Sequence, residues 1–356
     1  MTVPTLLEVE NVSTWFSTSK GTLHAVDDVS FTLGSGKTLC LVGESGSGKS
    51  VLARSVMNLL PRTALRPSGR VTFDGIDLRS VPPTEVRHLW GADIAMIFQD
   101  PMTSLNPVVR IGRQITESLR FHRDVRGRAA TLRAVELLSQ VGIPSPQSRL
   151  RSYPHELSGG MRQRVCIAMA LACEPKLLIA DEPTTALDVT IQRQILDLLQ
   201  RLQAEMGMAM IMVTHNLGIA AGRTDEIAVM YAGRIVEKGP TRELFANMRH
   251  PYTAALLSSI PRIERPSQTL LHAIPGRPSN VIDPSPGCRF ADRCRHARPR
   301  CLTEDPPLVP GAVPGHQYAC FHPVGTPEGD EALATNLTLG QTAAGLNVTS
   351  ADTEAA

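Results

Sequence analysis

Short apolar runs separated by amphipathic stretches characterise residues 5–258. Uninterrupted apolar runs of the length of a buried parallel strand occur at residues 39–42, 94–98, 177–180 and 209–213. Residues 191–205 instead have helical periodicity, with one apolar face made by Ile191, Ile195, Leu198, Leu199 and Leu202. Residues 51–60 have helical character before Pro61. The alternation predicts an α/β domain built on a largely parallel sheet.

Other stretches depart from this alternation. Residues 71–73 and 76–78 flank Asp74-Gly75 and predict a hairpin, which indicates an antiparallel β subdomain beside the parallel core. After residue 259 prolines crowd the chain and periodicity is lost, so we expect a Pro-rich and Cys-rich region over 259–324. Residues 325–356 lack aromatic residues, Lys and Arg, and are expected to form a disordered tail.

Composition narrows the class of protein. The chain has 42% hydrophobic and 20% charged residues, which argues against a disordered or coiled-coil chain. Lys and Arg number 36 against 34 Asp and Glu, a net charge of +2 that argues against a nucleic-acid binder. No apolar run is long enough for a bilayer span, and no signal-peptide pattern opens the chain. We therefore expect a cytoplasmic protein, which could still dock on a membrane protein.

The sharpest motif is GESGSGKS at residues 43–50, a full G-x-x-x-x-G-K-[ST] match between an expected strand and an expected helix. Glycines allow successive backbone N–H groups to surround phosphate oxygens, and the helix directs its positive end at the same anion. Lys49 can reach the β- and γ-phosphates, and Ser50 can ligate Mg²⁺. The expected ATP-binding residues of this loop are Gly43, Ser45, Gly46, Ser47, Gly48, Lys49 and Ser50.

A second site of charge follows the apolar run at residues 177–180, where Asp181 and Glu182 end the expected strand. Asp181 is expected to hold Mg²⁺, directly or through water, and Glu182 to polarise the attacking water. Side chains alternate along a strand, so the two carboxylates can point to different sides. Paired with the phosphate loop, the two acids indicate nucleotide hydrolysis.

Further motifs give the chain a family resemblance. LSGGMRQR at residues 157–164 resembles the signature motif of ABC ATPases, although Met161 stands where many members have Gln. Gln99 looks like the Q-loop glutamine, residues 186–188 look like the D-loop, and His215 looks like the switch histidine. Phe16 sits where the family places an aromatic residue on the adenine, with Trp15 as a competitor.

The resemblance implies a P-loop NTPase fold of the ABC type, with a helical subdomain beside the antiparallel one, over residues 5–258. It implies catalytic roles for Glu182, His215 and Gln99, with Gln99 also ligating Mg²⁺ beside Ser50 and Asp181. It further implies that Ser158, Gly159, Gly160 and Asp188 contact ATP. In ABC proteins the signature of one subunit faces the phosphate loop of another, so a head-to-tail ATPase dimer is expected.

Residues 99–107 and 250–257 resemble stretches of peptide-importer ATPases, as does the C-terminal cysteine pattern. The resemblance implies a subunit at the cytoplasmic face of the membrane that powers uptake of di- or oligopeptides. Its expected partners are a second, non-identical ATPase subunit, two membrane-spanning permease subunits and an extracytoplasmic binding protein, with no nucleic acid. Nickel-uptake ATPases are close relatives, so nickel is the alternative cargo. A soluble ABC ATPase and a non-hydrolysing regulator are further alternatives.

Four cysteines lie within the C-terminal region: Cys288, Cys294, Cys301 and Cys320. Four thiols suit either tetrahedral Zn²⁺ or a [4Fe–4S] cluster, and the wide spacing differs from the C-x2-C pairs usual in zinc ribbons. Members of the resembled family can carry a [4Fe–4S] cluster here, which is our expectation; Zn²⁺ and unligated thiols are the alternatives. Five arginines interleave with the first three cysteines and would offset the charge of a thiolate cluster, or form a solvated basic face.

Overall fold

The computed structural model describes residues 4–349 except 62, 101–103, 186, 260–273, 278, 280 and 285. The chain divides into two compact units, which we describe separately. The first unit comprises residues 1–8, 32–38 and 71–213. The second unit comprises residues 9–31, 39–70 and 214–356.

The sheet of the first unit consists of parallel strands, as the apolar runs predicted. β7 (Ile94–Ile97) pairs with β8 (Leu177–Asp181), and β8 pairs with β9 (Ala209–Thr214) in register Leu177 to Ala209. All side chains of β8 and β9 are buried, which explains why their sequences show no alternation. Helix α8 (Val189–Met206) buries the face predicted for it, although Ile191 is only half-buried.

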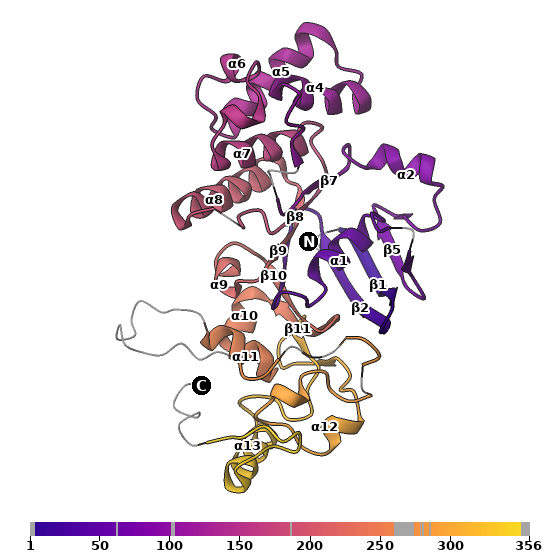
Figure 1. The fold of residues 1–356 in the computed structure, drawn as a ribbon, viewed down its shortest axis with the longest axis vertical. Coiled ribbons are helices and arrows are strands. Elements are labelled where there is room, and N and C mark those ends of the chain that lie inside the picture. Colours follow the sequence, from indigo (N-terminus) through magenta and orange to yellow (C-terminus); the bar gives the residue numbers. More distant parts are fainter. Residues whose placement is uncertain are drawn as a thin grey trace. The chain divides into compact units, whose positions relative to one another are not determined.

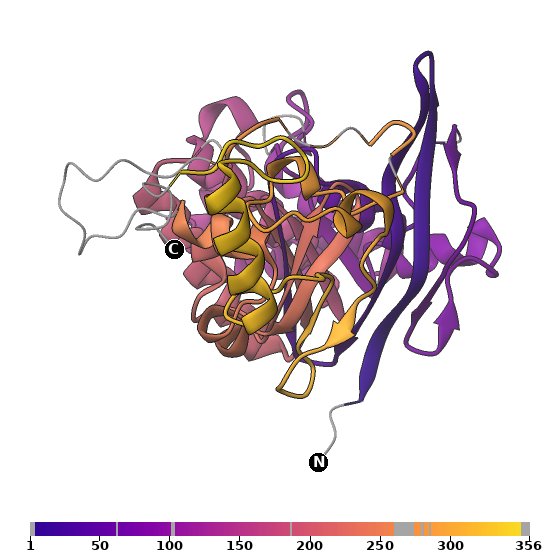
Figure 2. The same ribbon diagram turned by 90° about the horizontal axis from the view of Figure 1, so that it is seen from below.

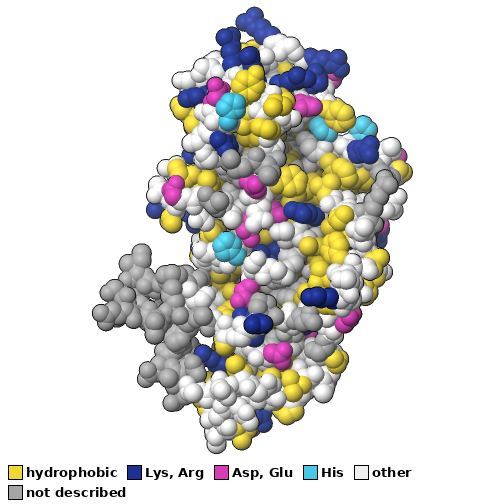
Figure 3. Space-filling model, in the orientation of Figure 1, with side chains coloured by type: hydrophobic (Ala, Val, Ile, Leu, Met, Phe, Trp, Pro, Cys, Tyr) yellow, Lys and Arg dark blue, Asp and Glu magenta, His cyan; other side chains and the backbone are white. Residues whose placement is uncertain are grey.

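A helical group makes up much of the rest of this unit. α4 (Ile111–His122), α5 (Gly127–Gln140) and α7 (Gly159–Ala170) pack on one another (Figure 1). On the face drawn in Figure 3, Lys and Arg side chains gather over α4 and α5. The smaller helices of this unit are α2 (Pro83–Leu89), α6 (Pro146–Arg149) and the 3₁₀ turn Pro154–Glu156. Among the described residues, no helix combines the length and apolar character needed to cross a membrane.

The expected hairpin is confirmed. β5 (Arg70–Phe73) pairs antiparallel with β6 (Ile76–Asp77), and Phe73 lies opposite Ile76. Asp74 and Gly75 both take positive φ angles, 48° and 79°. This is the backbone that a two-residue turn of type I′ requires, and Asp-Gly adopts it readily.

The second unit has paired strands of its own. β3 (Thr38–Val42) runs parallel to β10 (Glu226–Tyr231), which pairs antiparallel with β11 (Arg234–Pro240). β13 (Gln317–Tyr318) continues the sheet from β11, and β12 (Val309–Pro310) pairs with β13. Between β9 and β12, the described helices of this unit are α9 (Leu217–Ala220), α10 (Thr241–Ala246), α11 (Pro251–Ser258), the 3₁₀ turn Ala291–Arg293, and α12 (Arg300–Thr303). Side chains of β3 and β10 share one buried core with Tyr252, Phe290 and Cys294.

Two long strands, β1 (Thr5–Thr18) and β2 (Gly21–Gly34), run side by side (Figure 2). β4 (Ala64–Leu65) pairs with β1. Helix α1 (Lys49–Val56) is shorter than the stretch to residue 60 that its sequence favoured. Asn58 takes a positive φ of 55°, and the Leu59 N–H bonds to the Arg54 carbonyl, so a Schellman motif ends the helix.

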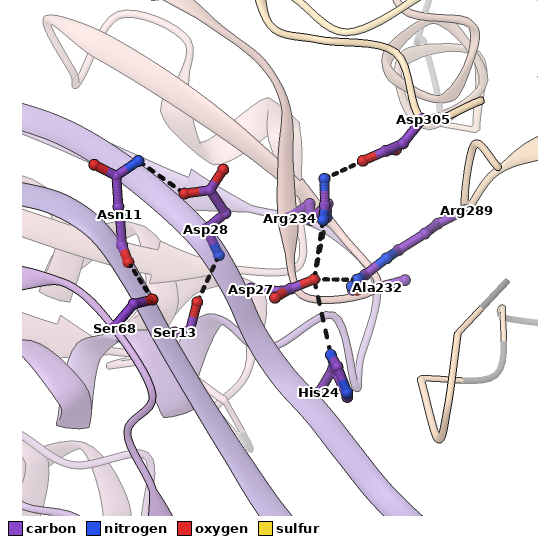
Figure 4. A network of polar contacts seen from close by, with 10 residues as sticks. All are labelled: Asn11, Ser13, His24, Asp27, Asp28, Ser68, Ala232, Arg234, Arg289 and Asp305. Atoms are coloured by element: carbon purple, nitrogen blue, oxygen red, sulfur yellow. Dashed lines mark hydrogen bonds and ion pairs between the residues drawn. The ribbon is translucent and has the colours of Figure 1, made fainter. Parts of the chain in front are cut away.

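Asp27 on β2 is the centre of a polar network in the second unit (Figure 4). Its carboxylate accepts hydrogen bonds from Arg234 of β11 at 3.1 Å and from Arg289 of the C-terminal region. Arg234 also binds Asp305. The guanidiniums of Arg289 and Arg234 outweigh the opposing effect of burial and hold the pKa of Asp27 below its ordinary value. This network ties the C-terminal region to β2.

The described part of the tail, up to residue 349, is folded, in contrast to the disorder expected from its composition. Helix α13 (Pro327–Leu339) begins with the Thr326 hydroxyl as N-cap and ends at Gly340 with a φ of 71°. Asn336 is fully buried and donates hydrogen bonds to the carbonyls of Arg295 and Ala297. Composition predicted disorder because the many small residues of this segment give little apolar signal. The helix is held against the C-terminal region by the polar contacts of Asn336 instead.

Candidate functional site

The GESGSGKS loop lies where the sequence placed it, between β3 and α1 in the second unit. Gly48 is the N-cap of α1 and has a φ of 99°. Lys49 is buried, and its Nζ donates to the carbonyls of Gly43 and Glu44 at 2.7 and 2.8 Å. The ammonium group thus orders the loop at the positive end of α1, and a helix N-terminus favours an anion. We call residues 43–50 the anion cradle.

Two glycines of the loop have no room for a side chain. A Cβ on Gly43 would overlap the carbonyl oxygen of Met230, and one on Gly48 would overlap the carbonyl oxygen of Ala25. In contrast, Ser45 and Gly46 at the loop's crest are exposed. The backbone at the base of the loop is thus fixed by close packing while its crest is open to a ligand, which fits the triphosphate that the motif implies.

Two aromatic residues, Trp15 and Phe16, are candidates for stacking on the adenine base, and both lie on β1 in the second unit. The indole of Trp15 is stacked on the imidazole of His24, with ring centroids 4.1 Å apart. Phe16 is half-buried and lies opposite Ala64 of β4. The stacking of Trp15 on a protein side chain favours Phe16 for the adenine, and this assignment stays a prediction.

The carboxylates expected to act in hydrolysis lie in the first unit, at the end of β8. Asp181 is fully buried, whereas Glu182 is half-buried and takes a φ of 47°. Its Oε2 accepts hydrogen bonds from Gln99 Nε2 at 3.1 Å and from Thr185 Oγ1 at 2.8 Å. A non-glycine residue in the left-handed region is uncommon and is found preferentially at functional sites. The fold thus brings Gln99 and Glu182 together, as a catalytic role for both requires.

The signature residues also lie in the first unit. Ser158 is the N-cap of α7, and its hydroxyl accepts from the Met161 N–H at 3.4 Å. Ser158 and Gly159 are exposed, and Gly160 packs close to Ile191 of α8. Asp188 is the exposed N-cap of α8, with its carboxylate 2.9 Å from the Ile191 N–H. The signature therefore presents a helix N-terminus to solvent, which suits contact with a phosphate of another subunit.

The remaining predicted site residues are His215, the D-loop and the stretch after Gln99. His215 is exposed and directly follows β9, in the second unit. Ala186 of the D-loop and residues 101–103 of the stretch after Gln99 lie outside the described residues. The catalytic and binding roles of the positions named here stay predictions.

The four C-terminal cysteines line one cavity in the second unit, together with His250, His296 and His322. Burial raises the pKa of Cys288 to about 12, and it also raises those of Cys294 and Cys320. Nevertheless, the described residues include no group of three or more His, Cys, Asp or Glu side chains arranged to hold a metal ion. The donors are therefore gathered, but this structure does not show them in a ligand geometry.

Sequence reasoning missed two residues that touch the phosphate loop, Arg293 and Tyr252. Arg293 is one of the five arginines among the first three cysteines, which the sequence predicts to offset cluster charge or form a solvated face. Its side chain is instead only 3% exposed and pairs with Glu44. Tyr252 was noted only as part of a resemblance, and its hydroxyl accepts the Glu44 N–H at 2.8 Å. The partners are more than two hundred positions apart, so no local pattern signals them.

Comparison with known proteins gives these motifs a family. Residues 26–185 match the ABC transporter family, and residues 236–301 match the C-terminal region of oligopeptide/dipeptide transporters. The oligopeptide transport ATP-binding protein OppD of Bacillus subtilis (strain 168) is 50% identical over 307 residues, covering 86% of each chain. OppD of Escherichia coli (strain K12) is 48% identical over 319 residues, covering 90% of this chain and 94% of the relative.

Among solved structures, the chain is similar to the ATP-binding cassette MJ0796, determined as a dimer in a post-hydrolysis state with ADP and Pi. The TM-score is 0.60 at 27% identity, covering 67% of this chain and 99% of the other. This likeness supports the expected P-loop ABC fold. From the motifs, the fold and these relatives, the chain belongs to the oligopeptide-transport ATP-binding proteins of the ABC transporter family.

Proposed function

We propose that this protein binds and hydrolyses ATP to power the uptake of peptides through an ABC importer. The observation that carries the proposal is the anion cradle of residues 43–50, closed at its base by glycines that admit no side chain. Membership of the oligopeptide-transport family supplies the link from ATP hydrolysis to peptide movement. ATPase activity of the purified importer, stimulated by peptide and lost in Lys49→Ala, is the direct test.

The assignment of roles follows from the chemistry of each side chain. Lys49 and the loop amides bind the phosphates, and Phe16 stacks on the adenine. Ser50, Gln99 and Asp181 would hold Mg²⁺, which would neutralise charge on the phosphates. Glu182 orients and polarises the attacking water, with its carboxylate steered by Gln99 and Thr185. His215 contacts the γ-phosphate.

A second ATPase subunit completes the site in this proposal. The N-terminus of α7 contacts the ATP that the partner holds, through Ser158, Gly159, Gly160 and Asp188. In return, the signature motif of the partner contacts the ATP held in this chain's phosphate loop.

Replacing Glu182 by Gln keeps its shape but removes the charge that polarises water. Glu182→Gln should therefore bind Mg·ATP without turnover and accumulate as a closed pair. Wild-type turnover by this variant would remove Glu182 from the mechanism.

The partner ATPase is proposed to be non-identical, and the pair to dock on two permease subunits fed by a binding protein, at the cytoplasmic face of the membrane. Support comes from the family of the C-terminal region, which is that of oligopeptide/dipeptide transporters. Co-purification of the intact complex, with mass spectrometry of its subunits and cargo, tests this. Recovery of nickel in place of peptide would favour the alternative cargo.

For the thiol-lined cavity we propose a [4Fe–4S] cluster, supported by four cysteines that share one cavity. Its role would be to hold the C-terminal region together, with no electron transfer assigned. The alternatives are Zn²⁺ and unligated thiols. Iron and sulfide content with the visible spectrum of anaerobically purified protein decides among them: a colourless protein with stoichiometric zinc, or with no metal, would overturn the proposal.

A further inference from the structure

Glu44, the second residue of the phosphate loop, is held by the C-terminal region through an ion pair. Arg293 Nη1 lies 2.6 Å from Glu44 Oε2, and Arg293 Nη2 lies 3.0 Å from Glu44 Oε1. Both residues belong to the second unit. Two parallel charge-assisted hydrogen bonds fix the direction of the carboxylate as well as its position. The phosphate loop is therefore held by Arg293 of the C-terminal region as well as by β3 and α1, which flank it in the sequence.

The guanidinium of Arg293 is fully satisfied. It has five N–H donors. Nε donates to the Pro275 carbonyl at 2.8 Å, and the remaining donors reach Glu44, the Tyr231 hydroxyl and the Ile274 carbonyl. A buried guanidinium with every donor engaged has one well-defined orientation. Arg293 is thus a rigid support and not a flexible surface side chain.

Tyr252 supplies a second contact to the same residue. Its hydroxyl accepts the backbone N–H of Glu44 at 2.8 Å, and its ring is fully buried between Tyr231 and Phe290. The carbonyl of Glu44 accepts from Lys49 Nζ. The carboxylate, amide and carbonyl of Glu44 are therefore each bound, two of them by residues far along the chain.

We propose that Arg293 and Tyr252 are positioning residues that hold the phosphate loop, through Glu44, in the shape that binds nucleotide. The inference rests on the proposed function of residues 43–50. Neither side chain needs to touch the nucleotide. Without them the loop would sample more conformations, and the free energy of ordering it would be taken from binding. The expected signature is weaker nucleotide affinity with little change in turnover at saturation.

The experiment measures the Kd of Mg·ADP, a ligand that cannot be hydrolysed, on the full-length protein by fluorescence of a labelled ADP. Tyr252→Phe removes one oxygen and keeps the ring, so the core should stay intact. Arg293→Lys keeps the charge but loses the paired hydrogen bonds. Each should raise Kd about tenfold, because each variant removes hydrogen bonds that hold Glu44 in place. In the assembled importer, KM for ATP should rise while kcat stays within about twofold.

Two control variants separate this inference from simpler explanations. Arg298 belongs to the same C-terminal segment and donates to Asn336 at 3.1 Å, so Arg298→Ala tests for general loss of an arginine contact and should leave Kd unchanged. Lys49→Ala tests the proposed function itself and should abolish binding. If Lys49→Ala binds normally, the proposed function fails.

The inference fails on its own if Lys49→Ala abolishes binding while Tyr252→Phe and Arg293→Lys bind Mg·ADP like the wild type. It also fails if the two variants lower the thermal midpoint of the ligand-free protein but leave Kd at lower temperature unchanged, because that pattern belongs to a purely structural role. A Kd raised equally in Arg298→Ala would likewise overturn it. In the background of Glu44→Gln, Arg293→Lys should have a smaller effect on Kd than in the wild type.

Discussion

Gln99 and Glu182 are joined by a hydrogen bond of 3.1 Å from the amide Nε2 to the carboxylate Oε2. The two residues lie just beyond the ends of the neighbouring parallel strands β7 and β8. The carboxyl ends of parallel strands meet at one edge of a sheet, and ligands of α/β proteins bind there. The sheet itself thus determines which amide meets the proposed catalytic carboxylate.

Gln99→Ala should lower kcat about tenfold, because Glu182 loses a hydrogen bond that, with the one from Thr185, directs its Oε2. Thr185→Ala should have an effect of similar direction. The measurement is steady-state ATPase activity of the assembled importer. Gln194→Ala serves as the matched control, since the Gln194 side chain pairs with Arg164. Unchanged kcat in both Gln99→Ala and Thr185→Ala would contradict a steering role.

Gly48→Ala should destabilise the protein far more than Gly46→Ala. Both glycines have positive φ angles, 99° and 81°. The added methyl of Gly48→Ala overlaps the backbone of Ala25, whereas nothing lies within 4 Å of one at Gly46. We expect a cost of about 1 kcal/mol at Gly46 from backbone strain alone and more than about 2 kcal/mol at Gly48. Urea denaturation without nucleotide measures both, and equal costs would argue against the close packing at the base of the loop.

Asp27→Asn should cost about 3 kcal/mol at neutral pH, since it leaves the buried Arg289 without its carboxylate. The folded-state pKa of Asp27 lies below the ordinary 3.8, because the neighbouring guanidiniums outweigh burial. Its stabilising contribution is therefore complete above pH 3.8 and is lost as pH falls through the folded-state pKa. Denaturation measures the free energy of unfolding of wild type and variant from pH 7 to pH 3. The difference between the two should be constant at first and should become smaller in acid. A difference that grows in acid would contradict a stabilising role for the Asp27 carboxylate.

Asn336→Ala should destabilise the second unit by about 2 kcal/mol, because the carbonyls of Arg295 and Ala297 lose buried donors. Thr338→Ala, on the exposed side of the same helix, should change stability by less than about 0.5 kcal/mol. Thermal unfolding compares the two. Equal, small effects would mean that α13 contributes no stability through Asn336.

Local patterns predicted what depends on local chemistry. The strands around Leu177 and Ala209, the hairpin at Asp74-Gly75 and the phosphate loop each have a short-range signal, since apolar runs, turn residues and glycines act where they stand. The family resemblance implied separate roles for Gln99 and Glu182, and the hydrogen bond between them is a finding of the structure. The carboxylate by itself does not reveal its partner.

The failures of prediction have a common physical origin. Helix α13 was missed because its burial depends on polar contacts from Asn336 to a distant segment, and composition does not encode those contacts. The neighbouring arginines in the sequence suggest a charged or solvated role for Arg293, whereas its side chain contacts Glu44 and Tyr231. Where a polar side chain is buried by tertiary packing, sequence periodicity carries no information about its partner.

Because Arg293 pairs with Glu44 of the phosphate loop, the C-terminal region cannot be exchanged freely between importers. A chimaera that joins this ATPase core to the corresponding region of another importer would bring together residues that have not been matched to one another. Such a swap would succeed only when both members of the Glu44–Arg293 pair, or an equally matched couple, are transplanted together.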